Sequence, residues 1–174
     1  MARIAVLIDD AFEDSEYSQP AEEFRRAGHT LVHLGLTRGA TVKGKKSGTA
    51  VTIDAPIADA GVDPYDALFI PGGYSPDRLR AHDEAVDFVR RFVRSKRPVF
   101  LICHAPQLLI TADVLRGRKV TGWKSIRKDI ENAGAHYFDR PVVEDGNLLS
   151  SREPGDIPAF VEAALKRLVA KVAA

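Results

Sequence analysis

Residues 99–109 read VFLICHAPQLL, and this stretch decides the fold. The run VFLIC at 99–103 is apolar without interruption, which is typical of a strand covered on both faces of a parallel sheet. Pro106 stands near the first turn of a predicted helix over 106–112, where a missing N–H costs little. The stretch therefore predicts a buried strand that turns directly into a helix, with Cys103 and His104 at the junction.

Two further apolar runs, IAVLI at 4–8 and ALFI at 67–70, have the same character. Helical patterns separate the runs and follow them, over 16–27, 84–95, 106–112, 125–133 and, most regularly, from Ile157 to Val172. Strands that alternate with helices predict an α/β fold with three layers. We expect a doubly wound, flavodoxin-like arrangement in which a mostly parallel sheet carries helices on both faces.

Two segments have the pattern of β-hairpins. Residues 41–54 carry Gly44 and Gly48 as turn candidates. In residues 142–150 the pair Asp145-Gly146 is a strong signal for a two-residue turn. We find no internal repeat, linker or low-complexity tract, so we expect residues 1–174 to form one domain.

Composition excludes several classes of protein. The 174 residues include 25 Lys+Arg and 24 Asp+Glu, a formal net charge of +1, which gives no basis for binding nucleic acid or an anionic membrane by bulk charge. No apolar run approaches the roughly 20 residues that span a bilayer, and the first residues lack the pattern of a signal peptide. We therefore expect a cytoplasmic protein. The single cysteine, Cys103, excludes an intramolecular disulfide and a zinc site with several thiolates, and we expect no metal or cofactor.

Ligands of doubly wound sheets bind beyond the carboxyl ends of the strands, where three segments of this chain meet. Cys103 lies at a sharp strand-to-helix turn, where the helix N-terminus favours the thiolate. By itself a free cysteine in this place is more often buried and inert. Pro71-Gly72-Gly73 lets backbone N–H groups approach a developing oxyanion, with Gly73 and His104 as the candidate donors.

Two acidic residues are candidates for the same site. If the Glu13 carboxyl lies beside the thiolate, Glu13 is expected to be protonated and to donate a hydrogen bond to the sulfur. The alternative for Glu13 is a carboxylate at a helix N-terminus. Asp77 is a candidate to orient His104, or else an ordinary solvated residue beside Arg78. We expect the side chains of Cys103 and His104 to point in different directions, and Cys103 to be ionised at neutral pH.

Glu13, Pro71-Gly72-Gly73 and Cys103-His104, in this order at the ends of parallel strands, resemble the PfpI family of intracellular cysteine peptidases. That family is part of the superfamily of the Parkinsonism-associated deglycase and the class I glutamine amidotransferases. The similarity runs along nearly the whole chain. It also includes FED at 12–14, ICHAPQLL at 102–109, LRGRKV at 115–120, NAG at 132–134 and SSR at 150–152.

The resemblance implies a cysteine-dependent hydrolase of the stress response. Cys103 would be the nucleophile, Glu13 its carboxyl partner, and the N–H groups of Gly73 and His104 the oxyanion hole. An acidic residue at the position of Asp77 reaches the histidine of a neighbouring subunit in oligomeric members, which implies a homo-oligomer, a dimer or a hexamer. The substrates implied are peptides or proteins and small carbonyl compounds such as methylglyoxal and its adducts.

Three departures from the family pattern affect the site. Ala105 stands where glycine is common and adds a Cβ near the nucleophile. Asp77 is one methylene shorter than the glutamate of archaeal relatives. Trp123 takes a place where an aromatic residue, frequently tyrosine, is usual, and it is our candidate for stacking on a substrate. No His-x-Glu triplet follows Cys103, which argues against glutamine hydrolysis.

Other functions fit parts of the pattern. A signalling receiver domain has an acidic pair like Asp9-Asp10, but its phosphorylated aspartate would end the strand that here ends in Pro71. A flavin or nucleotide binder lacks its phosphate loop, because neither GxGxxG nor a Walker motif occurs. The main alternative keeps the fold and makes Cys103 a redox sensor that is reversibly oxidised.

Overall fold

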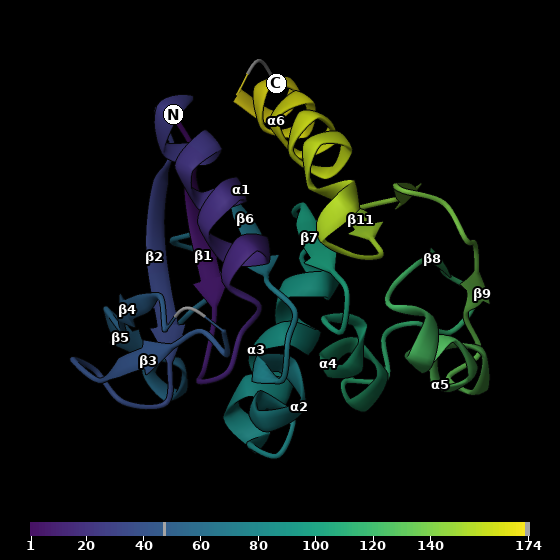
Figure 1. Ribbon diagram of the computed structural model, residues 1–174, viewed down its shortest axis with the longest axis horizontal. Helices are drawn as coiled ribbons and strands as arrows, with labels where there is room; N and C mark the ends of the chain where they lie inside the picture. Colours follow the sequence, from purple (N-terminus) through teal and green to yellow (C-terminus); the bar gives the residue numbers. More distant parts are fainter. Residues whose placement is uncertain (47, 173–174) are drawn as a thin grey trace.

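A seven-stranded sheet forms the centre of the computed structural model, which describes residues 1–46 and 48–172 (Figure 1). The strand order is β10-β11-β7-β6-β1-β2-β5, and all neighbouring strands are parallel except β10 and β11. This confirms the mostly parallel sheet. The strands are β1 (Arg3–Leu7), β2 (Thr30–Gly35), β5 (Ala55–Pro56), β6 (Ala67–Ile70), β7 (Val99–Ile102), β10 (Val143–Asp145) and β11 (Leu148–Ser151).

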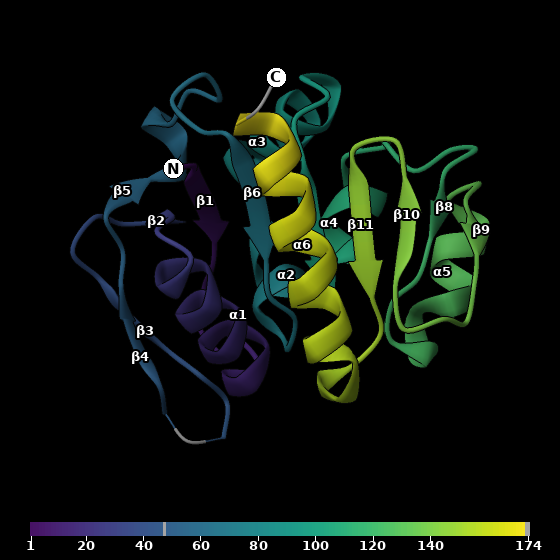
Figure 2. The ribbon, with the colours of Figure 1, turned by 90° about the horizontal axis from the view of Figure 1, so that it is seen from above.

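Helices cover both faces of the sheet, which confirms the three-layer, doubly wound arrangement (Figures 1 and 2). On one face α1 (Asp14–Arg26) packs beside α6 (Ile157–Val172). The other face carries α2 (Ser75–Leu79), α3 (Asp83–Arg94), α4 (Pro106–Thr111) and α5 (Arg127–Asn132). Short 3-10 turns, η1 (Ile57–Asp59), η2 (Lys124–Ile126) and η3 (Pro154–Asp156), complete the helical elements.

The two hydrophobic cores explain why the strands read as continuous apolar runs. Successive residues of a strand point to opposite faces. Val6 packs in the core under α1 and α6, whereas its neighbour Leu7 packs in the core under α2, α3 and α4. In β7 the same alternation places Phe100 in the core under α1 and α6 and Leu101 in the core on the other face. Every residue of β7 is buried.

Both predicted hairpins are confirmed, but the two-residue turn of the second lies one residue later than predicted, at Gly146-Asn147, because Asp145 pairs with Leu148. β3 (Thr41–Lys43) pairs antiparallel with β4 (Ala50–Thr52), and β10 turns into β11 through Gly146, which has φ +54°. A separate parallel pair, β8 (Lys119–Val120) and β9 (His136–Tyr137), lies beyond the sheet edge, and the sequence analysis did not predict it. The C-terminal helix is confirmed, but Val169 of its apolar stripe is 66% exposed, and the side chain of Val172 lies outside the described residues. None of the described helices is both long and apolar enough to cross a membrane.

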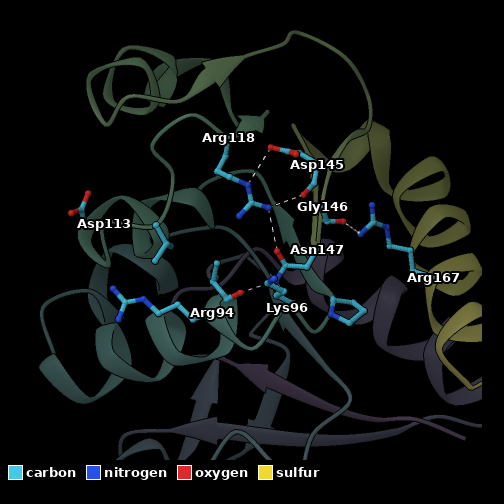
Figure 3. A pocket seen from close by; sticks show the side chains of 11 residues that line it. Arg94, Lys96, Asp113, Arg118, Asp145, Gly146, Asn147 and Arg167 are labelled. Carbon is cyan, nitrogen blue, oxygen red and sulfur yellow. Dashed lines mark hydrogen bonds and ion pairs between the residues drawn. The ribbon is translucent and has the colours of Figure 1, made fainter. Parts of the chain in front are cut away.

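Asn147 anchors the start of the strand that ends at Cys103. Its backbone carbonyl accepts from the N–H of Val99 at 2.8 Å. Its side-chain Nδ2 donates to the carbonyls of Val93 (3.0 Å) and Arg97 (2.9 Å), and its Oδ1 accepts from Arg118 at 3.2 Å. These contacts lie in a hollow of about 760 Å³ at the opposite end of β7 from Cys103 (Figure 3). Asn147 therefore connects the end of α3 to the starts of β7 and β11.

We expect Asn147→Ala to lower the free energy of unfolding by about 2 kcal/mol, because the carbonyl of Arg97 loses its side-chain donor and the carbonyl of Val93 loses one of its two donors. Urea unfolding followed by far-UV circular dichroism measures the change. Asn132→Ala is the matched control, since Asn132 is exposed at the end of α5 and should lose less than about 0.5 kcal/mol. Equal losses in the two variants would contradict the anchoring role.

Candidate active site

Cys103 lies in a strained turn between β7 and α4. Its φ of +61° falls in the left-handed region, which costs a residue other than glycine on the order of 1–3 kcal/mol. Hydrogen bonds hold the conformation from both sides: its N–H donates to Ser151 O at 3.0 Å, and its carbonyl accepts from the N–H of Trp123 at 2.9 Å. The residue is only 7% exposed. The turn thus presents the sulfur at the carboxyl end of the sheet while it covers most of the side chain.

Two backbone N–H groups point at this sulfur. They belong to Gly73 and His104, and both lower the pKa of the Cys103 thiol by hydrogen bonding to it. Gly73 has φ +78°, and a Cβ built on it would lie 2.4 Å from the backbone nitrogen of Glu13. Only glycine fits here, because the chain from Gly73 to Tyr74 pairs closely with the segment around Phe12. The structure therefore brings together the two donors that the sequence analysis selected.

The carboxyl group beside the thiol is that of Glu16, and the prediction of Glu13 for this place was wrong. Glu16 is fully buried, its Oε2 accepts from the N–H of Gly72 at 3.1 Å, and its carboxyl group hydrogen-bonds the Cys103 thiol. The second oxygen, Oε1, has no nitrogen or oxygen donor within hydrogen-bond distance. An oxygen without a donor in a buried site is well placed to carry a proton.

Glu13 instead faces the hairpin of β3 and β4. It is the residue before α1, and its carboxylate forms ion pairs with Lys45 (2.9 Å) and Lys46 (3.1 Å). Glu16 lies one turn further along α1, where its carboxyl group contacts Gly72 and Cys103. Glu13 is thus close to the alternative that the sequence left open, a carboxylate at a helix N-terminus.

Glu16 and Cys103 form a buried pair of acids. Burial raises the pKa of Glu16 to about 7, and the negative charge of Glu13 raises it as well, against the hydrogen bonds from Cys103 and Gly72. Burial also raises the pKa of the Cys103 thiol, and repulsion by the negative charge of Glu16 raises it further. This opposes the expectation of a fully ionised thiol at neutral pH. Two acids in contact cannot both be charged, so the pair loses a first proton near neutrality and holds the second strongly.

The side chain of His104 turns back to the sulfur, which corrects the expectation that it points elsewhere. Its Nδ1 lies 3.2 Å from Cys103 Sγ. Burial lowers the pKa of His104, the charge of Lys45 lowers it further, and Asp77 raises it. A neutral imidazole at this distance can accept a proton from the thiol or donate one to the thiolate.

Known proteins share the sequence of this chain over most of its length. Residues 2–167 match the model of the DJ-1/PfpI family. The chain belongs to this family. It is 53% identical over 167 residues to "Protein/nucleic acid deglycase 2" of Escherichia coli, an alignment that covers 95% of this chain and 97% of the relative. It is 54% identical over 159 residues to "General stress protein 18" of Bacillus subtilis, covering 91% and 92% of the two chains.

A solved DJ-1/PfpI structure gives the same picture of the fold. The chain superposes with a TM-score of 0.94 and 40% identity on a two-domain protein of Anabaena variabilis that contains DJ-1/ThiJ/PfpI-like and ferritin-like domains. The match covers 97% of this chain and 48% of that one, so this chain spans about half of the two-domain protein. The predicted family and fold class are confirmed.

Asp77 lies near His104 without a hydrogen bond to it among the described residues. Its carboxylate pairs at 2.8 Å with Arg80, the residue after α2, and its side chain is 55% exposed. Its charge nevertheless raises the pKa of His104. Within one DJ-1/PfpI subunit Asp77 is therefore not the orienting partner of His104, and completion of a triad across a subunit interface stays a prediction.

Trp123 lies next to the nucleophile turn. Its backbone N–H donates a hydrogen bond to the carbonyl of Cys103, and its half-buried ring packs against the core that contains Cys103. It also borders a hollow of about 160 Å³ together with Tyr137 and Arg152. This position is compatible with stacking on a substrate, which stays a prediction. Ala105 is fully buried in helical conformation with φ −53°, so the Cβ that replaces the family glycine causes no backbone strain.

Glu16 was not predicted as a site residue, although the pattern of α1 contains a signal for it. The buried side chains of α1 recur at helical spacing, and Glu16 stands four residues before Pro20 and eight before Phe24 on the same face. An acidic residue on the buried face of a helix needs a partner or a proton. Glu16 is such a residue and could have been selected on this ground. Glu13, which precedes the helix, is not part of its buried face.

Proposed function

We propose that this protein is a cysteine-dependent hydrolase that removes small carbonyl adducts from amines, with Cys103 as the nucleophile. One observation carries the proposal: the Cys103 sulfur faces the Glu16 carboxyl group and the N–H groups of Gly73 and His104 at the same time. A relative that is 53% identical is named a protein and nucleic acid deglycase, which supports this substrate class.

The geometry supports the following chemistry. In the adduct, one carbon carries both the amine nitrogen and a hydroxyl group. The Cys103 thiolate attacks this carbon, a sulfur–carbon bond forms, and the carbon–nitrogen bond breaks as protonated Glu16 gives its proton to the leaving amine. The N–H groups of Gly73 and His104 donate hydrogen bonds to the oxygen on the same carbon. Water then attacks this carbon, the sulfur–carbon bond breaks, the proton of the water goes to the Glu16 carboxylate, and the aldehyde leaves as its hydrate.

The low exposure of the sulfur favours a small substrate group over an extended polypeptide. Cys103 is 7% exposed, so a carbonyl group at the end of a side chain reaches it more easily than a peptide bond within a strand. Peptide hydrolysis is the second activity that the same residues would support. We place the reaction in the cytoplasm, where a single free thiol stays reduced. A homo-oligomer would offer His104 an acidic partner from a second subunit.

The test follows release of the amine. A short peptide with its lysine modified by methylglyoxal is freed of aldehyde and incubated with the protein and an excess of an aldehyde scavenger, and mass spectrometry measures the unmodified peptide. We expect release faster than the spontaneous reversal in the scavenger alone. Release at the spontaneous rate would contradict the proposal. Oxidation of Cys103 by peroxide without any turnover would favour the redox sensor.

A further inference from the structure

Lys45 occupies a defined place at the rim of the candidate site. It follows β3 in the hairpin that runs beside α1 (Figures 1 and 2). Its N–H donates to Phe12 O at 3.0 Å, and Phe12 forms bridges with Gly44 on one side and Gly73 on the other. The backbone of Lys45 is therefore separated from the oxyanion donor Gly73 by a single intervening segment.

The ammonium group of Lys45 is held in place from two sides. Its Nζ lies 2.9 Å from Glu13 Oε2 and 5.2 Å from the centre of the Tyr74 ring. The side chain is only 28% exposed, against 68% for the neighbouring Lys46. A cation that contacts both a carboxylate and an aromatic face keeps a restricted position. A lysine ammonium has three N–H donors, and Glu13 takes one of them.

The charge of Lys45 acts on all three reactive groups of the site. It favours the ionised forms of Cys103 and Glu16, and it helps to lower the pKa of His104. Burial opposes the charge of Lys45, but the ion pair with Glu13 more than compensates, so the pKa of Lys45 is raised and the group stays charged. Two lysines share the single carboxylate of Glu13, so this carboxylate does not neutralise Lys45 alone.

We propose that Lys45 is a substrate-positioning residue that selects carbonyl compounds with a carboxylate beside the electrophilic carbon. The inference rests on the proposed function of Cys103 as the nucleophile. Bound at the sulfur, such a compound places its carboxylate next to the remaining N–H donors of Lys45. A neutral carbonyl compound gains nothing from this contact.

The test compares two alkylating reagents that differ only in charge. Iodoacetate and iodoacetamide both form a sulfur–carbon bond with the Cys103 thiolate and release iodide. The ratio of their second-order rate constants cancels any change in the thiol pKa, since both rates depend on the same thiolate. We expect Lys45→Met to lower the ratio of iodoacetate to iodoacetamide on the order of fivefold at low salt.

Lys46→Met is the matched control, because it removes the same charge from the same carboxylate but from an exposed side chain. We expect it to change the ratio by less than about twofold. A ratio that is unchanged in Lys45→Met, or that falls equally in both variants, would overturn the inference. Alkylation does not depend on turnover, so a hydrolase test that fails while the ratio behaves as expected would remove the proposed function and leave the charge selection by Lys45 intact.

Discussion

Cys103→Ser is expected to lower turnover of carbonyl adducts by at least about a thousandfold. Serine keeps the shape of the side chain in the strained turn, but a hydroxyl is much harder to ionise than a thiol. The same burial that raises the pKa of the Cys103 thiol would act on the hydroxyl. The initial rate of amine release from the modified peptide, normalised to folded protein, measures the loss.

The variant must be shown to fold. Cys103 is a small, buried group, so we expect the thermal midpoint of Cys103→Ser to stay within a few degrees of the wild-type value. Because the chain has a single cysteine, the variant also loses all reaction with thiol reagents, which confirms the substitution. Turnover within tenfold of wild type would show that another group attacks the substrate.

Glu16→Gln is expected to lower turnover at pH 7 by about a hundredfold. Glutamine retains the shape and accepts the hydrogen bond from Gly72, but it cannot pass a proton to the leaving amine. In the wild type the pair of Glu16 and Cys103 loses its first proton near pH 7, since burial raises the pKa of Glu16 to about 7. We expect the alkylation rate of Cys103 to keep rising above pH 7, because burial and the negative charge of Glu16 raise the pKa of the thiol.

In Glu16→Gln the alkylation rate should rise at lower pH than in the wild type. The Glu16 carboxyl group raises the pKa of the Cys103 thiol through its negative charge and through its hydrogen bond, and the substitution removes that charge. Burial continues to raise the pKa of the thiol in the variant. The alkylation rate by iodoacetamide between pH 5 and 10 compares the two pH profiles. An unchanged midpoint would show that the Glu16 carboxyl group is not coupled to the sulfur.

The free energy of unfolding should also depend on pH through the raised pKa of Glu16. A carboxyl group with a raised pKa in the folded state binds its proton more tightly there than in the unfolded chain. Its contribution to the free energy of unfolding is therefore present below about pH 4.5 and is lost as the pH rises to about 7, by on the order of 3 kcal/mol. Urea unfolding at pH 5 and pH 7 measures the loss, which Glu16→Gln should abolish.

Glu13→Gln distinguishes the carboxyl group chosen from the sequence from the one found in the structure. Glu13 forms ion pairs with Lys45 and Lys46, and its charge is a smaller contribution to the pKa of Glu16 than burial. We expect the midpoint of alkylation to move by less than about one pH unit, and downward, because a negative charge near Glu16 is removed. A shift in Glu13→Gln as large as that in Glu16→Gln would contradict the assignment.

The fold could be predicted because its signals are local. Uninterrupted apolar runs such as VFLIC indicate strands buried on both faces, and the cores on both sides of Phe100 and Leu101 confirm the reason. The residue types around Gly146 indicated a turn, which lies one residue later than predicted because Asp145 pairs with Leu148. The short pair β8 and β9 was not, since two residues per strand carry no periodicity, and the pairing of Lys119 with His136 depends on the tertiary structure.

The place of the chemistry could be predicted from the sequence, because Cys103 ends a buried strand and Gly73 follows the neighbouring strand, so both meet at one edge of the sheet. Which acid reaches the sulfur depends on the tertiary structure. Glu13 and Glu16 are three residues apart at the start of one helix, and their positions in the sequence do not show which of them reaches the sulfur. The rotation of α1 against the sheet buries Glu16 beside Gly72 and Cys103 and leaves Glu13 to the lysines of the hairpin. The protonation state follows from that placement, because burial and charge pairing act on a group only where the fold has put it.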